Sequence, residues 1–240
     1  VYGTKLTIAL IENKLKEHNL MKSTKRKVVK HGQSVNLGCF RVEFIKTNHS
    51  IADSAALALF TPAGIIVHTG DFKVDYTPVF GDAFDLARFA ELGRKGVLAL
   101  LSDSTNAIRK GFTASERTVG KTFDAIFAEH KNNRIIVATF ASNVDRVQQI
   151  IFTAEKYGRK VVVEGRSMVN VITTAAELGY LRVPDQTLIE IDQVKNYPDE
   201  QTVLITTGSQ GESMAALSRM ASGMHRKVSI KPNDVVIMSS

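Results

Sequence analysis

Two side chains that could act in metal chemistry each follow a predicted strand directly. His49 comes after the segment IKTN, and Asp71 comes after IIVHTG. Side chains at the carboxyl ends of strands can converge on one place from distant positions of the chain, and imidazole and carboxylate groups are both zinc ligands. Both residues are also ordinary turn residues. Residue type alone therefore leaves a metal site and a pair of turns as alternatives.

The histidines as a set contain no local metal-binding motif. The chain has six of them, and no two lie within four positions of each other, which excludes His-x-His and His-Glu-x-x-His pairs. Any metal site in this sequence has to be assembled by the fold.

A second group of candidates lies where a predicted strand leads into a predicted helix. Ser142 and Asn143 follow RIIVATFA and precede apolar residues at helical spacing over 144–154. Free N–H groups and a hydroxyl at a helix start can bind phosphate. Ser142 with Asp145 is equally typical of a plain helix cap, so both interpretations stay open. The segment TTGSQGES at 206–213 has the same setting but matches neither the P-loop nor the dinucleotide fingerprint.

The composition narrows the class of protein. A chain of 240 residues with 44% apolar and 23% charged residues is typical of a globular protein and unlike a disordered one. The single cysteine, Cys39, favours a reducing, cytoplasmic setting, and its strand-like surroundings predict a buried side chain. No apolar run reaches the length of a membrane span. The net charge of +7, densest over residues 22–30, fits either a polyanionic partner or a solvated basic loop.

The periodicity predicts two domains. After a helix over 4–18, residues 1–111 are rich in strands, with a strand near 40–46, a hairpin over 56–72 and a buried strand from Val97. Thr113 and Glu116 form a capping-box pattern, and from there apolar strands near 134–140, 160–165, 202–208 and 234–240 alternate with amphipathic helices. One of these helices is expected to turn Met214 inward. Residues 112–240 are therefore predicted to form a parallel sheet covered on both faces.

Five blocks of sequence carry a resemblance to a known family. In order, they are TNHSIADS (47–54), TPAGIIVHTGDFKVDYTPV (61–79), LLSDSTNA (100–107), ATFASNVDRVQQI (138–150) and TTGSQGESMAALSRMASG (206–223). They resemble the ribonuclease J family, in the β-CASP branch of the metallo-β-lactamase superfamily. The resemblance implies an α/β fold: a partial metallo-β-lactamase αββα sandwich over 1–111, then a truncated β-CASP domain over 112–240 with a parallel sheet and flanking helices.

The resemblance also implies roles for particular residues. His49 matches a zinc ligand of the family, and Asp71 matches the aspartate that bridges two zinc ions. Asp103 matches the acidic residue of the first β-CASP motif. Ser142 matches a serine in the cleft that holds the phosphate on the 5′ side of the RNA, with Asn143 beside it. A carboxylate between two divalent ions would let them share a water that loses its proton near neutral pH.

The sequence also departs from the family pattern at several positions. The main metal motif, His-x-His-x-Asp-His, and two further histidines are missing, and Ser213 stands where the family pattern has proline. We therefore expect the chain to be a segment of a longer, zinc-dependent enzyme that cleaves single-stranded RNA by endonuclease and 5′-to-3′ exonuclease action. The intact enzyme is expected to be cytoplasmic and homo-oligomeric. The segment alone is expected to be inactive. The alternatives are a non-catalytic RNA-binding or assembly module, a small-molecule metallohydrolase of the same superfamily, and a nucleotide-binding α/β domain.

Overall fold

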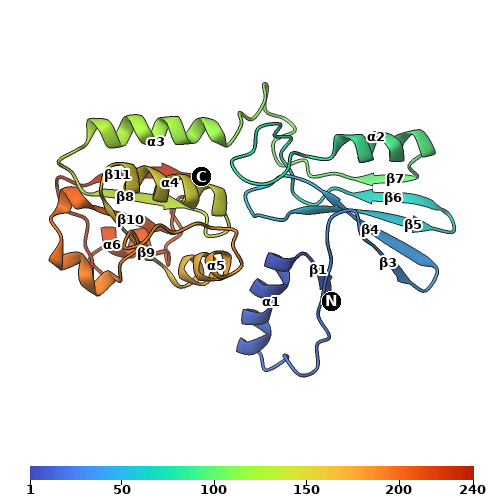
Figure 1. Cartoon of the computed structure of the whole chain (residues 1–240), viewed down its shortest axis with the longest axis horizontal. Coiled ribbons are helices and arrows are strands. Elements are labelled where there is room, and N and C mark those ends of the chain that lie inside the picture. Colours follow the sequence, from blue (N-terminus) through green and yellow to red (C-terminus); the bar gives the residue numbers. More distant parts are fainter. The chain divides into compact units, whose positions relative to one another are not determined.

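A computed structural model describes all 240 residues, which divide into two compact units, Val1–Glu116 and Arg117–Ser240 (Figure 1). The division falls five residues after the boundary predicted at residue 111. The reason is a set of hydrogen bonds to Asp75: the Ser115 hydroxyl and the Glu116 N–H both donate to its carboxylate, at 3.0 and 2.9 Å. The segment before the first helix of the second unit is thereby tied to the first.

The first unit is built on a five-stranded sheet. Strands β3 (Ser34–Leu37), β4 (Phe40–Lys46), β5 (Ala55–Thr61) and β6 (Gly64–His68) are antiparallel neighbours, and β7 (Ala99–Leu101) joins β6 in parallel. The hairpin predicted over 56–72 is confirmed and consists of β5 and β6. Its turn is closed by the Thr61 hydroxyl oxygen, which accepts N–H groups from Ala63 and Gly64 at 3.2 Å.

One helix covers one face of this sheet. Phe89 and Leu92 of α2 (Leu86–Lys95) pack against a cluster of sheet residues. Arg88 reaches the same face, where its guanidinium donates two hydrogen bonds to the carboxylate of Glu43, at 2.7 and 2.8 Å. The sheet members of the cluster are Ile45, Ala56, Ala58, Phe60, Ile65 and Val67.

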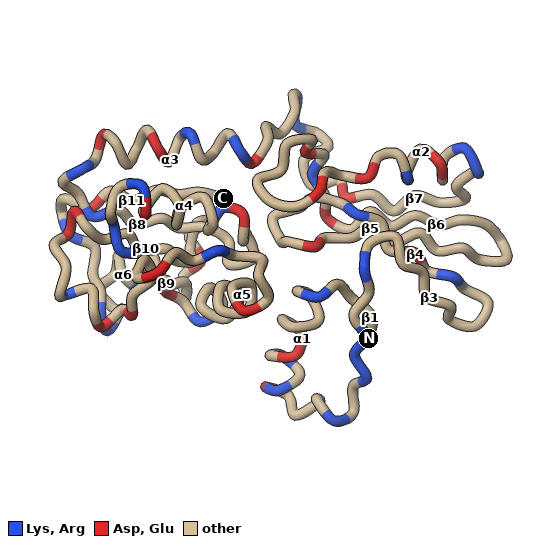
Figure 2. The backbone as a smooth tube through the Cα atoms, viewed as in Figure 1, with Lys and Arg blue, Asp and Glu red and all other residues tan.

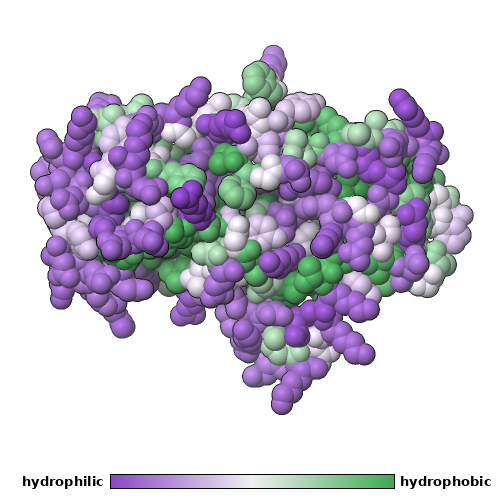
Figure 3. All heavy atoms as spheres, in the orientation of Figure 1, coloured by the Kyte–Doolittle hydropathy of each residue, from purple (hydrophilic) through white to green (hydrophobic).

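The strand from Val97 was predicted to be buried, and that prediction is wrong. β7 lies at the edge of the sheet, and Leu98, Leu100 and Leu101 are 62, 63 and 49% exposed. An apolar sequence indicates that a strand can be buried, but a neighbour on its second edge is needed to bury it. Figure 3 shows apolar side chains among hydrophilic ones on the visible face of this unit.

The amino-terminal part of the unit contains a helix and two very short strands. α1 (Lys5–Glu17) confirms the helix predicted over 4–18, and β1 (Tyr2–Gly3) pairs in parallel with β2 (Lys27–Val28). The basic residues 22–30 lie along the segment that links α1 to β2 and continues past it (Figure 2). Cys39 is exposed at the turn between β3 and β4, so its predicted burial is wrong. The αββα sandwich stays a prediction for this unit.

The second unit confirms the predicted parallel sheet. Its four strands are all parallel, in the order β11 (Val235–Ser239), β8 (Ile135–Thr139), β10 (Thr202–Thr206) and β9 (Lys160–Glu164). Every residue of the central strands β8 and β10 is buried, which explains their unbroken apolar sequences. The helices are α3 (Arg117–Glu129), α4 (Val144–Lys156), α5 (Arg166–Glu177), α6 (Ala216–Ala221) and two 3-10 helices, η1 (Ile191–Asn196) and η2 (Asp199–Gln201).

Three local predictions for this unit are wrong. Thr113 and Glu116 form no capping box, because α3 begins at Arg117 and the Glu116 N–H bonds to Asp75. Met214 precedes the short helix α6 and is 82% exposed. The segment DVVIMSS at 234–240, predicted from its apolar run to be a core strand, forms β11 at an edge of the sheet, where none of its residues is fully buried. No helix of the protein is both long and apolar enough to cross a membrane.

Candidate metal and phosphate sites

In the first unit, three predicted site residues lie at the same end of the sheet, just after the strands that precede them. β4 and β6 run in the same direction because each is antiparallel to β5, and β7 is parallel to β6. These three strands therefore have their carboxyl ends at the same end of the sheet. His49 follows β4, Asp71 follows β6 and Asp103 follows β7. The convergence of His49 and Asp71 that the sequence suggested is what this topology produces.

His49 and Asp71 form a close pair. The His49 Nε2 and the Asp71 Oδ2 are 3.7 Å apart, and the two side chains are 34 and 76% exposed. The loops that carry them are joined directly, since the Lys73 N–H donates to the Asn48 carbonyl at 2.7 Å. The two donor atoms are thus accessible from solvent and held on neighbouring loops.

Asp103 is tied to the same loops. Its N–H donates to the hydroxyl oxygen of Thr69, and its carboxylate accepts the N–H of Phe72 at 3.4 Å. The hydroxyl and N–H of Thr105 donate to the other carboxylate oxygen at 2.6 and 2.9 Å, and these bonds, with a smaller effect of His49, lower the pKa of Asp103. Asp103 is therefore an ionised group that orders the loop beginning at Asp71.

The donor types fit zinc, but their number does not. Imidazole nitrogen and carboxylate oxygen are both zinc ligands, and a zinc site in a protein has at least three of them. No group of three or more His, Cys, Asp or Glu side chains in this chain is placed to hold a metal ion. His49 and Asp71 alone do not make a zinc site, and no catalytic step through a metal follows from these residues.

The second unit has the strand topology at which open α/β sheets bind ligands. The neighbouring strands β8 and β10 continue into α4 and α6, and these lead in opposite directions, to β9 on one side of the pair and to β11 on the other. Ligands of open parallel sheets bind at the carboxyl ends of strands where connections diverge in this way. Ser142 and Asn143 follow β8, and residues 207–213 follow β10.

At the start of α4, the helix cap is Asn143 and not Ser142. The Asn143 side-chain oxygen accepts the N–H of Arg146 at 3.0 Å, and Asn143 is 4% exposed. Capping by Asn143 leaves the half-buried Ser142 hydroxyl without a hydrogen bond to the protein. Of the two candidates, Ser142 is the one free to bind a ligand.

Two hydroxyl groups near the carboxyl ends of β8 and β10 were missed by sequence reasoning. Thr139 ends β8 and Ser209 lies in the loop after β10; they are 1 and 7% exposed, and neither hydroxyl has a hydrogen-bond partner. Buried hydroxyls are nearly always paired, so two unpaired ones at the ends of neighbouring strands favour the binding of a polar ligand there. A threonine in a strand and a serine in a loop are too common to be singled out from sequence.

The loop after β10 is held close to the start of α6. The Leu217 N–H donates to the Thr207 carbonyl at 3.1 Å. Gly208 has φ +113°, and a Cβ there would lie 3.0 Å from the Cβ atoms of Ala215 and Leu217. Only glycine fits this position without displacing the helix.

Comparisons with known proteins agree with this architecture. The family described as "Ribonuclease J, beta-CASP domain" matches residues 132–240. The chain is 49% identical to ribonuclease J of Helicobacter pylori, 46% to ribonuclease J of Synechocystis and 43% to ribonuclease J2 of Bacillus subtilis. Each alignment covers the whole chain, which spans 35, 38 and 43% of the length of these relatives.

A solved structure supports the fold. A protein of unknown function from Enterococcus faecalis superposes with a TM-score of 0.59 at 16% identity, over 85% of this chain and 52% of that one.

The parallel sheet with its flanking helices, together with the family match over residues 132–240, defines the second unit as a β-CASP domain. The whole chain is similar to proteins named ribonuclease J, as the five sequence blocks predicted.

Proposed function

We propose that this chain is a segment of a zinc-dependent ribonuclease that hydrolyses phosphodiester bonds of single-stranded RNA, by endonuclease and 5′-to-3′ exonuclease action in RNA maturation and decay. The observation that carries the proposal is the pair formed by His49 and Asp71, 3.7 Å apart, in a chain 43–49% identical to proteins named ribonuclease J. Hydrolysis of RNA needs an activated water and a fixed phosphate, and the two candidate sites supply residues suited to these two tasks.

The first unit supplies part of the metal centre in this proposal. His49 and Asp71 are two of the ligands, and Asp103 positions the Asp71 loop through the Phe72 N–H. Zinc, when bound, lowers the pKa of its water. The other ligands come from outside this chain, which spans less than half the length of its curated relatives. The isolated chain is therefore inactive.

The second unit binds the RNA in this proposal. The Ser142 hydroxyl and the N–H groups at the start of α4 contact a phosphate, supported by the unpaired hydroxyls of Thr139 and Ser209. Asn143 contributes by capping the helix and so fixing Ser142. The net charge of +7 favours a polyanionic partner. The enzyme is further proposed to act in the cytoplasm, without a membrane partner, as a homo-oligomer.

The test uses the purified chain with a 5′-labelled single-stranded RNA. We expect binding that weakens as salt is added and no hydrolysis with or without zinc. Ser142→Ala should weaken binding by about tenfold to a hundredfold, the effect of losing one hydrogen bond to a charged group. Ser34→Ala, which removes an exposed hydroxyl from the first unit, is the control and should bind normally. Zinc-dependent hydrolysis that Asp71→Ala abolishes would contradict the inactivity of the isolated chain.

A second candidate function is a non-catalytic RNA-binding or assembly module. The observation in its favour is the incomplete ligand set around His49 and Asp71. The two functions differ in what happens when the missing ligands are restored. A nuclease segment then gains turnover, whereas a module still binds RNA without cleaving it.

A further inference from the structure

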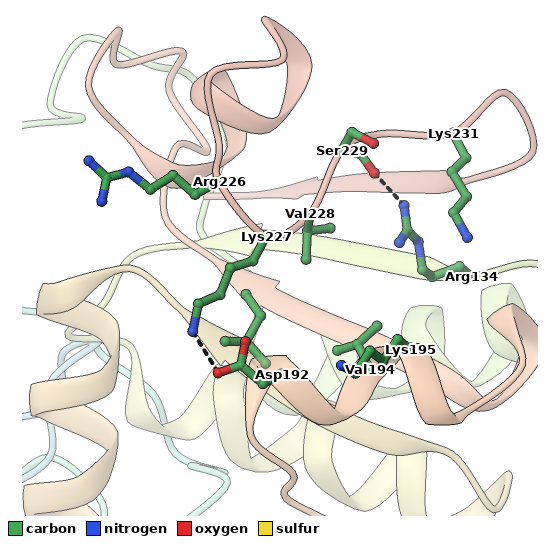
Figure 4. A pocket seen from close by; sticks show the side chains of 10 residues that line it. Arg134, Asp192, Val194, Lys195, Arg226, Lys227, Val228, Ser229 and Lys231 are labelled. Atoms are coloured by element: carbon green, nitrogen blue, oxygen red, sulfur yellow. Dashed lines mark hydrogen bonds and ion pairs between the residues drawn. The ribbon is translucent and has the colours of Figure 1, made fainter.

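The second unit contains a pocket whose lining does not include Ser142. Its volume is about 420 Å³, and it lies between η1 and residues 226–231, which precede β11 (Figure 4). Arg134 in its wall directly precedes β8, and Lys231 lies four residues before β11, so this wall is at the amino ends of the strands. Ser142 and Ser209 follow the carboxyl ends instead.

The pocket combines an apolar surface with a basic rim. Ile191, Val194 and Val228 line it, and all three belong to the hydrophobic cluster that packs on one face of the sheet. The cluster fixes these side chains in place. The charged lining residues are one carboxylate, Asp192, and five cations, Arg134, Lys195, Arg226, Lys227 and Lys231.

The wall of the pocket is rigidly anchored. Arg134 is paired with Asp234, with both side chains almost fully buried, and its guanidinium also donates to the Ser229 carbonyl at 2.6 Å. On the other side of Ser229, the N–H of Val228 donates to the Nδ1 of His225 at 3.2 Å. The Nε2 of His225 in turn lies 3.2 Å from the Oε1 of Glu164 in β9, so the backbone that carries the basic residues is held to the sheet at two places.

Two of the five cations are left without an ionic partner. Lys227 pairs with Asp192 at 2.8 Å, across the pocket in Figure 4, and Lys231 pairs with Asp199 at 2.7 Å. Glu164 and Glu190 also act on Lys227. Lys195 and Arg226 pair with no carboxylate, so the excess positive charge of the pocket resides on them.

The Lys227–Asp192 pair does not close the pocket firmly. Its side chains are 48 and 71% exposed, and exposed pairs of this kind contribute little to stability. A ligand phosphate can therefore take the place of Asp192 as the partner of Lys227.

We propose that this pocket binds one nucleotide unit of single-stranded RNA. The base lies against Ile191, Val194 and Val228, and the phosphate takes the place of Asp192 beside Lys227. Lys195 and Arg226, on the rim of the pocket, add the positive charge that attracts it. The volume is within the usual range of small-ligand sites, and an apolar surface with a few converging charges is their usual composition. Free mononucleotide has the same chemistry as one unit of RNA. That the bound nucleotide belongs to RNA rests on the proposed function. That the pocket binds a nucleotide rests only on its own lining residues.

The experiment uses the whole chain with two probes, uridine monophosphate and a short oligouridylate. Binding of the oligouridylate is measured by fluorescence anisotropy at several salt concentrations for the double variant Lys195→Ala/Arg226→Ala. The control is Lys121→Ala/Lys131→Ala, which removes the same charge from exposed positions of the second unit outside the pocket. In parallel, the methyl resonances of Val194 and Val228 are followed by NMR with each probe.

The pocket variant should bind about threefold to tenfold more weakly, and the slope of log K against log salt should fall by about 0.7 for each phosphate that the protein no longer neutralises. The affinity of the control variant for oligouridylate should change much less. Methyl shifts with oligouridylate alone or with both probes support the proposal and identify the source. An equal weakening in both double variants, or no methyl shift with either probe, would overturn it. Ser142→Ala should leave these methyl shifts unchanged. The experiment therefore distinguishes a failure of the phosphate site proposed at Ser142 from a failure of the proposed pocket.

Discussion

Replacing Asp75 by alanine should destabilise the first unit strongly. This residue is 4% exposed, and its carboxylate accepts the N–H groups of Thr77 and Glu116, both at 2.9 Å, and the Ser115 hydroxyl at 3.0 Å. A hydrogen bond to a charged group is worth about 1.5–3 kcal/mol. Because water will reach part of the emptied site, we expect a loss of about 3 kcal/mol rather than the sum of three bonds.

The assay is urea unfolding followed by circular dichroism, with hydrogen exchange of the Thr77 and Glu116 amides as a local measurement. With an m-value of about 2 kcal/mol/M, a loss of 3 kcal/mol lowers the midpoint for this unit by about 1.5 M. The control is Asp82→Ala, which changes an exposed aspartate of the same loop region. If Asp75→Ala and Asp82→Ala unfold at the same midpoint and exchange equally, the role assigned to Asp75 is wrong.

The same residue predicts a pH dependence. Burial alone raises the pKa of Asp75, but the N–H groups of Glu116 and Thr77 and the Ser115 hydroxyl outweigh it, and the net effect is a lowered pKa. Its contribution is therefore fully present at neutral pH and is lost as the pH falls through the lowered value. The stability difference between the wild type and Asp75→Asn should be constant from about pH 7 to 5 and shrink in stronger acid. A difference that grows on acidification would contradict this sign.

Three further predictions concern single positions. Asp234→Ala leaves the buried guanidinium of Arg134 unpaired and should destabilise the second unit by about 3–5 kcal/mol in urea unfolding; an unchanged midpoint would refute this. Gly208→Ala should weaken RNA binding, because its Cβ would displace the start of α6, whereas Gly158→Ala, with open space around it, should bind normally. Titration of the isolated chain with zinc by calorimetry should show no tight site, and a tight site that His49→Ala abolishes would mean that a third ligand was overlooked.

The closeness of His49 and Asp71 was easier to predict from sequence than the burial of the strands around them. His49 and Asp71 could be placed together because both follow strands that run in the same direction, which the alternation of strands and turns already implied. The burial of Leu100 could not be predicted in the same way. An apolar side chain such as that of Leu100 can be buried, but it is exposed here because β7 lies at the edge of the sheet.

In the second unit, the parallel sheet was predictable and the ligand-binding detail was not. Central strands such as β8 are buried on both faces, and this gives the continuous apolar runs that identify a parallel sheet. The capping role that the sequence assigned to Ser142 is taken by Asn143. The unpaired hydroxyls of Thr139 and Ser209 depend on which partners the fold leaves within reach, and nothing in the residue types reveals that.

The most direct test of the central claim is a segment exchange. The matching 241 residues of Helicobacter pylori ribonuclease J, 49% identical, are replaced by this chain, and hydrolysis of single-stranded RNA is measured with zinc. We predict that the exchanged protein cleaves the RNA and that Asp71→Ala reduces the rate by at least about a hundredfold, because it removes a metal ligand. A folded exchanged protein that binds RNA without cleaving it, or that cleaves equally well with Asp71→Ala, would contradict the assignment of this chain to the catalytic centre of a ribonuclease.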